Sequence, residues 1–176
     1  RTSVAAYHGY NYLLARESLT DHLPIEQRKN KTRHKLLKIR AKKVICATGS
    51  IERPLIFDNN DRPGIFLSSA IKKYADLFGV ACGEKNIFLT NNDSAYETAI
   101  SLIQKGINVE AVIDNREEVD SKLVYEVERN NIKVYKGFTV VNTSGYRRIN
   151  KVTIMRLSKD GQKVVGSKIN LSCDCL

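Results

Sequence analysis

The sequence predicts an α/β fold of three layers, in which a parallel sheet is joined to an antiparallel meander. Between residues 85 and 135, short apolar segments alternate with segments of helical period, which is the order of a β-α-β-α-β unit. After residue 138 the apolar period changes to two, as is typical of antiparallel strands with one buried face. With 176 residues, 42% of them hydrophobic and 27% charged, the chain is large enough for a hydrophobic core.

The first part of the chain predicts a small antiparallel meander followed by a connector. Residues 18–34 are polar and contain a proline, so we expect a loop there. Residues 51–66 hold two of the three prolines and show no period, which indicates a connector. Strands are predicted at residues 3–7, 12–15, 36–40 and 43–47, the last of them ending in Thr48-Gly49.

The remainder predicts helices that alternate with parallel strands, and then antiparallel strands alone. Ser68 is expected to cap the first helix and Gly79 to end it, while Asp160-Gly161 predicts a type I′ hairpin turn. We expect helices at residues 69–78, 94–105 and 121–129, parallel strands at 85–89, 109–113 and 132–135, and antiparallel strands at 139–141, 151–157 and 163–171.

The turn after residues 85–89 lies where a dinucleotide-binding fold carries G-x-G-x-x-G. Thr90, Asn92 and Ala95 occupy the three glycine positions. Ala95 still allows helix and strand to pack closely, and Asn92 tolerates a left-handed backbone, but the β-branched Thr90 replaces the first glycine poorly. The sequence therefore predicts a Rossmann-like fold with a weakened pyrophosphate site. If NAD or NADH binds there, we expect Thr90, Asn91 and Asn92 to contact it weakly.

The helix that follows this turn supplies its own anion at its N-terminus. Asp93 precedes the helix, and Ser94 and Glu97 match the capping-box pattern S-x-x-E. If these side chains take the free N–H groups, a pyrophosphate must displace them and lie beside the like charge of Asp93. We expect this to cost about 1–4 kcal/mol of binding free energy.

Two further stretches bear on dinucleotide binding. Asp114 ends the second parallel strand, where an acidic residue would hold the ribose hydroxyls of NAD; an ordinary strand-end aspartate paired with Arg116 explains it equally well. Thr48 and Gly49 would place small residues and backbone N–H groups beside a dinucleotide in another domain, although a plain strand and turn is the simpler interpretation.

These patterns divide the chain into consecutive parts. Residues 1–50 are predicted to be the edge of an outer dinucleotide-binding domain, and residues 51–82 a connector and helix. Residues 83–167 are predicted to be an inserted NAD-binding-like domain, and residues 168–176 a strand that returns to the outer domain. The chain starts in strand-like sequence and stops after an apolar stretch, so we expect an excised fragment.

The net charge of +10 is concentrated near the N-terminus. Between Arg28 and Lys43 there are nine Lys or Arg residues and no acid. Such a run can bind phosphates, but it lacks the aromatic residues that stack on bases, which disfavours nucleic acid. A strand with solvated basic ends, or a face that meets an acidic partner surface, remains as an explanation.

Cysteine and histidine usage indicates neither a metal site nor a catalytic nucleophile. Cys46, Cys82, Cys173 and Cys175 form no C-x-x-C pair, and no histidine completes a zinc set. We therefore expect reduced, buried thiols in a cytoplasmic protein. No apolar run approaches the roughly 18 residues of a membrane span. Nothing in the chain resembles a general base or a nucleophile with its partners, so we expect no catalytic residue.

Four strings resemble the α subunit of heterotetrameric sarcosine oxidase, and the resemblance extends over essentially the whole chain. The strings are Ala47-Thr-Gly-Ser-Ile-Glu-Arg-Pro-Leu-Ile-Phe57, Asn60-Asp-Arg-Pro-Gly64, Thr90-Asn-Asn-Asp-Ser-Ala-Tyr96 and Val112-Ile-Asp-Asn-Arg116. The α subunits of opine oxidases and hydrogen cyanide synthases are similar around Ala-Thr-Gly and Glu-Arg-Pro, but they more usually carry glycines at the second turn.

This resemblance implies an FAD/NAD(P)-binding fold of the disulfide-reductase type, with one nucleotide-binding fold nested in another. It implies that NAD is the cofactor, that the other subunits of the oxidase are partners, and that the flavins oxidising sarcosine lie in the partner subunit. If the outer fold holds NAD, the turn at Thr90 is free to lose its glycines. The chain would then be a non-catalytic, dinucleotide-binding portion of the complex.

Two other functions remain open at this point. In the first, the fold is kept as a scaffold with a degenerate nucleotide site, and the basic run 28–43 docks a partner subunit. In the second, the chain is a self-standing NAD(P)H-dependent reductase, which is supported by fold analogy alone.

Overall fold

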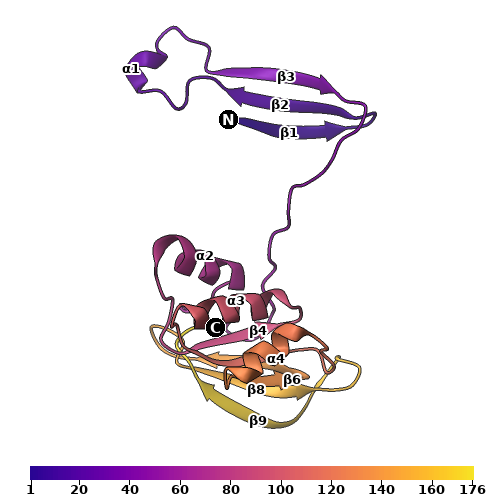
Figure 1. Cartoon of the computed structure of the whole chain (residues 1–176), viewed down its shortest axis with the longest axis vertical. Helices are drawn as coiled ribbons and strands as arrows, with labels where there is room; N and C mark the ends of the chain where they lie inside the picture. Colours follow the sequence, from indigo (N-terminus) through magenta and orange to yellow (C-terminus); the bar gives the residue numbers. More distant parts are fainter. The chain divides into compact units, whose positions relative to one another are not determined.

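The computed structural model describes residues 1–176, and the chain divides into two compact units, Arg1–Ser50 and Ile51–Leu176. Each unit is described by itself. Figure 1 shows the first unit as a small sheet with one short helix, and the second as helices layered on two sheets. None of the helices is long and apolar enough to span a membrane.

The first unit is the predicted meander, an antiparallel sheet in the order β1-β2-β3. Its strands are Thr2–His8 (β1), Tyr12–Ser18 (β2) and His34–Arg40 (β3), and a single helical turn, Ile25–Arg28 (α1), lies in the predicted loop. The predicted strand at 43–47 is wrong. Residues 43–50 have no regular structure, because no strand of the chain pairs with them, and Ile45 is 91% exposed.

The loop between β2 and β3 is organised around the carboxylate of Asp21. Its Oδ1 accepts a hydrogen bond from Nε of Arg33 at 2.6 Å, and its Oδ2 accepts one from the hydroxyl of Ser18 at 2.8 Å. The guanidinium of Arg28 binds the backbone carbonyls of Asp21 and Leu23. These contacts close the loop onto the end of β2.

We expect the carboxyl of Asp21 to titrate with a pKa of about 2, because Arg33 and then Ser18 stabilise its charged form. A depressed folded-state pKa stabilises the unit above the ordinary value of 3.8, and this contribution is lost as the pH falls toward 2. An NMR titration measures this pKa. Arg33→Ala should raise it toward 3.8, whereas Lys31→Ala, which removes a charge from the same loop, should leave it low; equal shifts would contradict the assignment.

The second unit is built on a parallel sheet in the order β4-β5-β6. Its strands are Asn86–Thr90 (β4), Val109–Asp114 (β5) and Lys133–Lys136 (β6). Helix Ser94–Gln104 (α3) connects β4 to β5, and helix Lys122–Arg129 (α4) connects β5 to β6. The predicted β-α-β-α-β unit is therefore confirmed, and Ser121 caps α4 by accepting a hydrogen bond from the N–H of Leu123.

An antiparallel sheet in the order β7-β8-β9 follows, as predicted. Its strands are Phe138–Ser144 (β7), Lys151–Leu157 (β8) and Val164–Ser172 (β9). The predicted two-residue type I′ turn at Asp160-Gly161 is wrong in detail. The strands are joined by residues 158–163, and the carboxylate of Asp160 accepts bonds from the hydroxyl of Ser158 and from the N–H of Gln162. Within residues 158–163, only Gly161 adopts a positive φ, of 69°.

Two hydrophobic cores make the second unit three-layered. Helices α3 and α4 cover one face of the parallel sheet, where Phe88, Tyr96 and Val112 are buried. The antiparallel sheet covers the other face, where Ile87, Ile113 and Ile154 are buried. Residues of β4 and β5 alternate between the two cores, which explains why the runs 87–89 and 111–113 are apolar on both faces.

Helix Ser68–Phe78 (α2) packs against α3 and ends as predicted at Gly79, which is left-handed. The predicted cap by Ser68 is wrong, because Ser68 already belongs to the helix and its hydroxyl bonds to Thr98. Glu52 caps the helix instead: its two carboxylate oxygens accept the N–H groups of Ser68 and Ser69 at 3.0 and 2.8 Å. A carboxylate is favourable here because it faces the positive end of the helix dipole.

The last residues of the chain run beside the free edge of β4. The carbonyl of Cys175 accepts the N–H of Ile87 at 2.9 Å, and Cys175 forms a parallel bridge with Asn86. Residues 168–172 belong to β9, and the whole segment 168–176 lies in the second unit. The four-part division made from the sequence, including the return of 168–176 to an outer domain, stays a prediction.

Candidate functional site

The candidate site is the end of β4, the turn that follows it, and the end of β5. Thr90 and Asp114 are register partners at the carboxyl ends of these two strands. In open parallel sheets this edge is where ligands bind. The hydroxyl of Thr90 donates to the carbonyl of Asn92 at 2.8 Å and accepts the N–H of Asn92 at 3.1 Å, so the turn is closed by its own first residue.

The start of α3 is capped differently from the prediction. Ser94 is the first helical residue, and Asp93 is the capping residue but makes no side-chain bond to a helix N–H group, so the predicted capping box is wrong. Asn92 caps the helix instead. Its Oδ1 accepts hydrogen bonds from the backbone N–H of Ser94 at 3.0 Å and from the hydroxyl of Ser94 at 2.6 Å. Asn92 also has no positive φ, so it does not replace a glycine through a left-handed backbone.

Asp114 is fully buried, and each of its carboxylate oxygens is satisfied within the protein. Oδ2 accepts the hydroxyl of Tyr96 at 2.8 Å and a terminal nitrogen of Arg116 at 2.7 Å. Oδ1 accepts the backbone N–H and Nε of Arg116 at 2.9 and 3.1 Å. The pairing with Arg116, one of the two explanations left open by the sequence, is confirmed.

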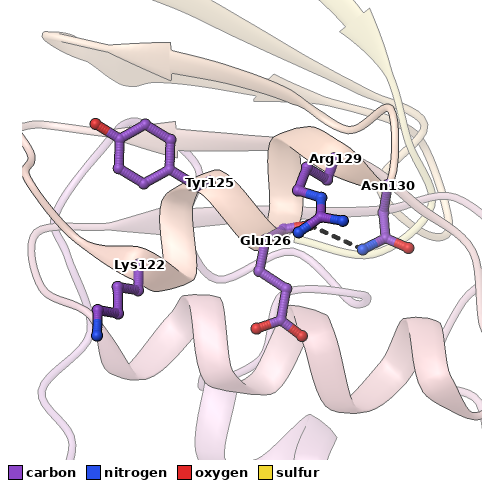
Figure 2. A pocket seen from close by; sticks show the side chains of 5 residues that line it. All are labelled: Lys122, Tyr125, Glu126, Arg129 and Asn130. Atoms are coloured by element: carbon purple, nitrogen blue, oxygen red, sulfur yellow. Dashed lines mark hydrogen bonds between the residues drawn. The ribbon is translucent and has the colours of Figure 1, made fainter.

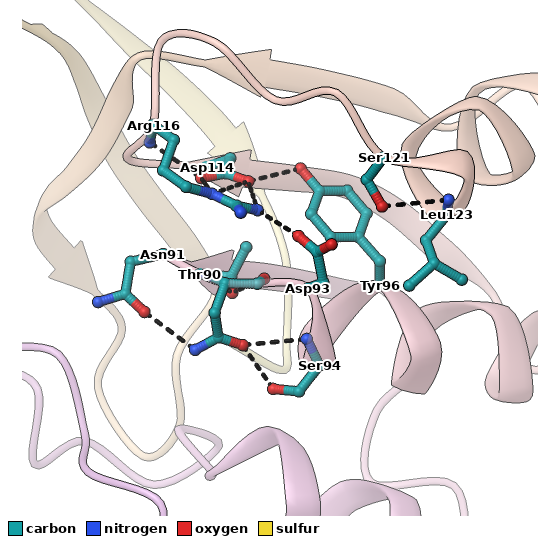
Figure 3. Close-up of polar contacts among 10 residues, drawn as sticks. Thr90, Asn91, Asp93, Ser94, Tyr96, Asp114, Arg116, Ser121 and Leu123 are labelled. Carbon is teal, nitrogen blue, oxygen red and sulfur yellow. Dashed lines mark hydrogen bonds and ion pairs between the residues drawn. The ribbon is translucent and has the colours of Figure 1, made fainter.

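The guanidinium of Arg116 also joins the two ends of the site. The nitrogen that contacts Asp114 lies 2.8 Å from Oδ1 of Asp93, so one cation bridges two carboxylates from different segments (Figure 3). Arg116 and then Ser121 lower the pKa of Asp93, while burial and then the carboxylate of Asp114 raise the pKa of Tyr96. We call Asp93, Tyr96, Asp114 and Arg116 the bridge cluster.

The hydrogen-bonding groups of the bridge cluster that a nucleotide would need are already bonded within the protein. A ribose would need free acceptor positions on Asp114, which is 0% exposed. A pyrophosphate would need free N–H groups at the start of α3, where the Asn92 side chain takes that of Ser94, and would lie beside the anionic Asp93. None of these groups is a nucleophile with an adjacent base.

The structure brings together only some of the predicted site residues. Thr90, Asn92 and Asp114 lie at one edge of the sheet, and Asn91 is exposed beside them, with its Oδ1 accepting a bond from the Asn92 amide. Thr48 and Gly49 belong to the first unit, where they are exposed, and Gly49 has a φ of 70° with open space around it.

One hollow of the surface lies away from the site. It measures about 490 Å³ and lies along the outer face of α4, lined by Lys122, Tyr125, Glu126, Arg129 and Asn130 (Figure 2). These side chains point outward at helical spacing rather than converging on a common point. No cluster of three or more His, Cys, Asp or Glu side chains is placed to hold a metal ion.

Sequence reasoning missed Tyr96 and the second contact of Arg116. Tyr96 is 0% exposed and is among the largest fully buried side chains of the protein. Its spacing of three and four residues from the apolar Ala99 and Ile100 on α3 is a signal that it faces the core. No local signal links Arg116 to Asp93, because they are 23 positions apart and meet only when β4 and β5 pair.

Comparison with solved structures identifies the fold. The chain is similar to L-proline dehydrogenase from P. horikoshii (TM-score 0.54, 20% identity, 99% of this chain and 26% of that one). It is also similar to an FAD-dependent pyridine nucleotide-disulphide oxidoreductase from Desulfovibrio vulgaris (0.56, 16%, 99% and 41%) and to thioredoxin reductase from T. acidophilum (0.57, 18%, 81% and 45%). The predicted FAD/NAD(P)-binding fold of the disulfide-reductase type is confirmed.

Comparison with curated sequences points to one group of relatives, although no protein-family model matches the chain. Sarcosine oxidase subunit alpha of Corynebacterium sp. (strain U-96) is 34% identical over 176 residues, which is all of this chain and 18% of the relative. The subunit of Corynebacterium sp. (strain P-1) is 36% identical over 162 residues, 91% of this chain and 16% of the relative. That of Rhizobium meliloti (strain 1021) is 40% identical over 95 residues, 54% and 9%. The chain spans less than a fifth of the length of each of these relatives, and over that span it is related to the alpha subunits of sarcosine oxidase.

Proposed function

We propose that this chain is a non-catalytic portion of the alpha subunit of an oxidoreductase that demethylates sarcosine, and that its second unit is a scaffold. The relationship to sarcosine oxidase alpha subunits supports the subunit assignment. The bridge cluster supports the scaffold, because Arg116 and Tyr96 occupy the acceptor positions of Asp114 that a ribose would use. The alternative is that the chain belongs to the alpha subunit of a related opine oxidase or hydrogen cyanide synthase. Such an enzyme would have the same scaffold but act on a different substrate.

NAD is the cofactor that we assign to such a subunit, and we place it in the nucleotide-binding fold to which residues 1–50 contribute. Thr48 and Gly49 are the residues of this chain that would lie near it, since both are exposed and Gly49 leaves open space for close approach. The flavins that accept electrons from the substrate are assigned to a partner subunit. In the basic run 28–43, Arg33 pairs with Asp21, and the other lysines and arginines of the run form no ion pair, so they are available to a partner.

The scaffold proposal predicts that the chain gives no saturable NADH fluorescence change at millimolar concentration through its second unit. Asn92→Gly restores a glycine to the turn and removes the side chain that caps α3, so it is the variant that best reopens a pyrophosphate site. Asn91→Gly is the matched control, because Asn91 is exposed and its side chain only touches Asn92.

The outcomes of this titration separate the alternatives. Absence of binding by the wild type and by both variants is expected. Saturable binding that Asn92→Gly strengthens and Asn91→Gly leaves unchanged would overturn the scaffold proposal. Binding that neither substitution alters but that Gly49→Val abolishes would support NAD in the first unit. Turnover of any electron acceptor by this chain alone would contradict its non-catalytic role.

A further inference from the structure

Two segments that are far apart in sequence are fastened together at the amino-terminal end of β4. We call residues 82–85 and 173–175 the neck. The carboxylate of Asp174 accepts the N–H groups of Glu84 and Lys85 at 3.0 and 2.8 Å, and its own N–H donates to the carbonyl of Lys85. Although burial opposes it, these two N–H groups hold the pKa of Asp174 below its usual value.

The guanidinium of Arg148 fastens the neck a second time. Its Nε donates to the carbonyl of Asp174 at 2.7 Å, and a terminal nitrogen donates to the carbonyl of Cys82. One planar group therefore holds the backbones of Cys82 and Asp174 side by side. Arg148 therefore holds Cys82 beside Asp174, and Cys175 directly follows Asp174 in the sequence.

A close approach at Gly83 places the side chain of Cys175 against the segment that carries Cys82. A Cβ added to Gly83 would lie 2.5 Å from the Cβ of Cys175, so only glycine fits there. Cys175 is fully buried in the core between the helices and the parallel sheet, and Cys82 is partly exposed and packs against the same core. Burial raises the pKa of Cys175 to about 12, and the nearby Cys82 thiol contributes to this shift.

We propose that Cys82 and Cys175 are an oxidative modification site that forms a disulfide across the neck in the presence of a peroxide. Cys173 is the wrong partner, because its side chain lies in the other core, between the two sheets. Cys46 is exposed and lies in the first unit. The proposal concerns the second unit alone and does not depend on the function proposed above.

The chemistry balances with hydrogen peroxide as the oxidant. The accessible thiolate of Cys82 attacks one peroxide oxygen, so its sulfur becomes a sulfenic acid and the other oxygen leaves as water after protonation. The thiolate of Cys175 then attacks the sulfur of Cys82, the S–S bond forms, and a second water leaves with the proton of the Cys175 thiol. Two thiols are oxidised, and one peroxide is reduced to two waters.

The high pKa of both thiols makes this reaction slow at neutral pH. Burial raises the pKa of Cys82 as well, and Arg148 only partly offsets this. Because the thiolate is the reactive form, the rate should rise with pH by up to about tenfold per unit. The disulfide would join the two ends of the segment that carries β4 to β9, so it should make the unfolding of this segment require reduction or a higher temperature.

Peptide mapping tests the proposal directly. The chain is treated with hydrogen peroxide, its remaining thiols are blocked with N-ethylmaleimide, and it is digested with trypsin without reductant. We expect residues 74–85 to be joined to the peptide that begins at Ile169, and dithiothreitol to separate them. Cys173→Ser should retain the cross-link, and Cys82→Ser and Cys175→Ser should each abolish it.

Three results would overturn the proposal. Cys82 could be recovered as a sulfinic acid or as the N-ethylmaleimide adduct without a link to Cys175. The cross-link could survive Cys175→Ser, which would assign it to Cys173. It could also form equally with Cys46, which would mark it as a random oxidation product. Because the peptide 169–176 contains both Cys173 and Cys175, fragmentation of the cross-linked wild-type peptide must show the N-ethylmaleimide label on Cys173, and this decides the question even if Cys175→Ser does not fold.

Discussion

Replacing Arg116 by alanine should destabilise the second unit by about 3 kcal/mol, as expected when one partner of a buried ion pair is removed. The side chain of Asp114 is 0% exposed and would keep only Tyr96 and a backbone N–H as donors, while Asp93 would lose its cation. Arg116 itself is 33% exposed, which places the effect at the lower end of the range for such pairs. The free energy of unfolding from urea denaturation measures the loss.

The matched control is Lys105→Ala, which breaks the ion pair with Asp76 on the surface of the same unit. Both side chains of that pair are more than a third exposed, at 41% and 36%, so the loss should stay below about 1 kcal/mol. Arg116→Lys keeps the charge but loses the multiple contacts of the guanidinium, and it should fall between the two. Equal losses for Arg116→Ala and Lys105→Ala would show that the bridge cluster contributes no more than a surface pair.

Gly145→Ala should destabilise the second unit by about 3 kcal/mol or more, because backbone strain and steric overlap add. Gly145 has a φ of 144°, which side chains rarely adopt, and an added Cβ would overlap the carbonyl oxygen of Arg148. The turn that Gly145 allows also directs Arg148 to the carbonyls of Cys82 and Asp174. The substitution should therefore loosen the neck as well as the turn.

Gly161→Ala is the control for Gly145→Ala. Its φ of 69° is also positive, but no atom lies within 4 Å of an added Cβ, so only the backbone cost of about 1 kcal/mol applies. Urea denaturation compares the two variants, and hydrogen exchange at the amides of Glu84 and Lys85 reports on the neck. Similar losses of stability in both variants would refute the steric argument, and unchanged exchange in Gly145→Ala would refute the link to the neck.

The sequence was sufficient for those parts of the fold that depend on local pattern. The helical period of residues 94–104 and the apolar run 111–113 of β5 predict the parallel sheet, because each indicates which faces are buried. The predicted strand at 43–47 failed because a strand needs a partner, and pattern alone does not show whether one is present. The turn at Asp160-Gly161 failed because the loop between β8 and β9 is longer than two residues.

The position of the candidate site was predicted from the sequence, but the hydrogen-bond partners of its residues were not. Thr90, Asn92 and Asp114 do lie together at the carboxyl edge of the sheet, as the strand order requires. Which side chain takes which donor could not be predicted, because Asp93 and Asn92 are both plausible caps and only the paired sheet brings Arg116 to Asp93. The capping role of Glu52 could not be predicted for the same reason, because Glu52 caps a helix that begins 16 positions later in the chain.

The bridge cluster has a consequence for how the second unit would behave in a living cell. A domain that binds a cofactor is stabilised by mass action, so its folded fraction follows the supply of that cofactor. In the scaffold that we propose, the cation and hydroxyl that hold Asp114 are covalent parts of the chain and are present at a fixed ratio in every molecule. The unit would then be equally folded in nucleotide-starved and nucleotide-rich cells, and it could be assembled before any cofactor arrives.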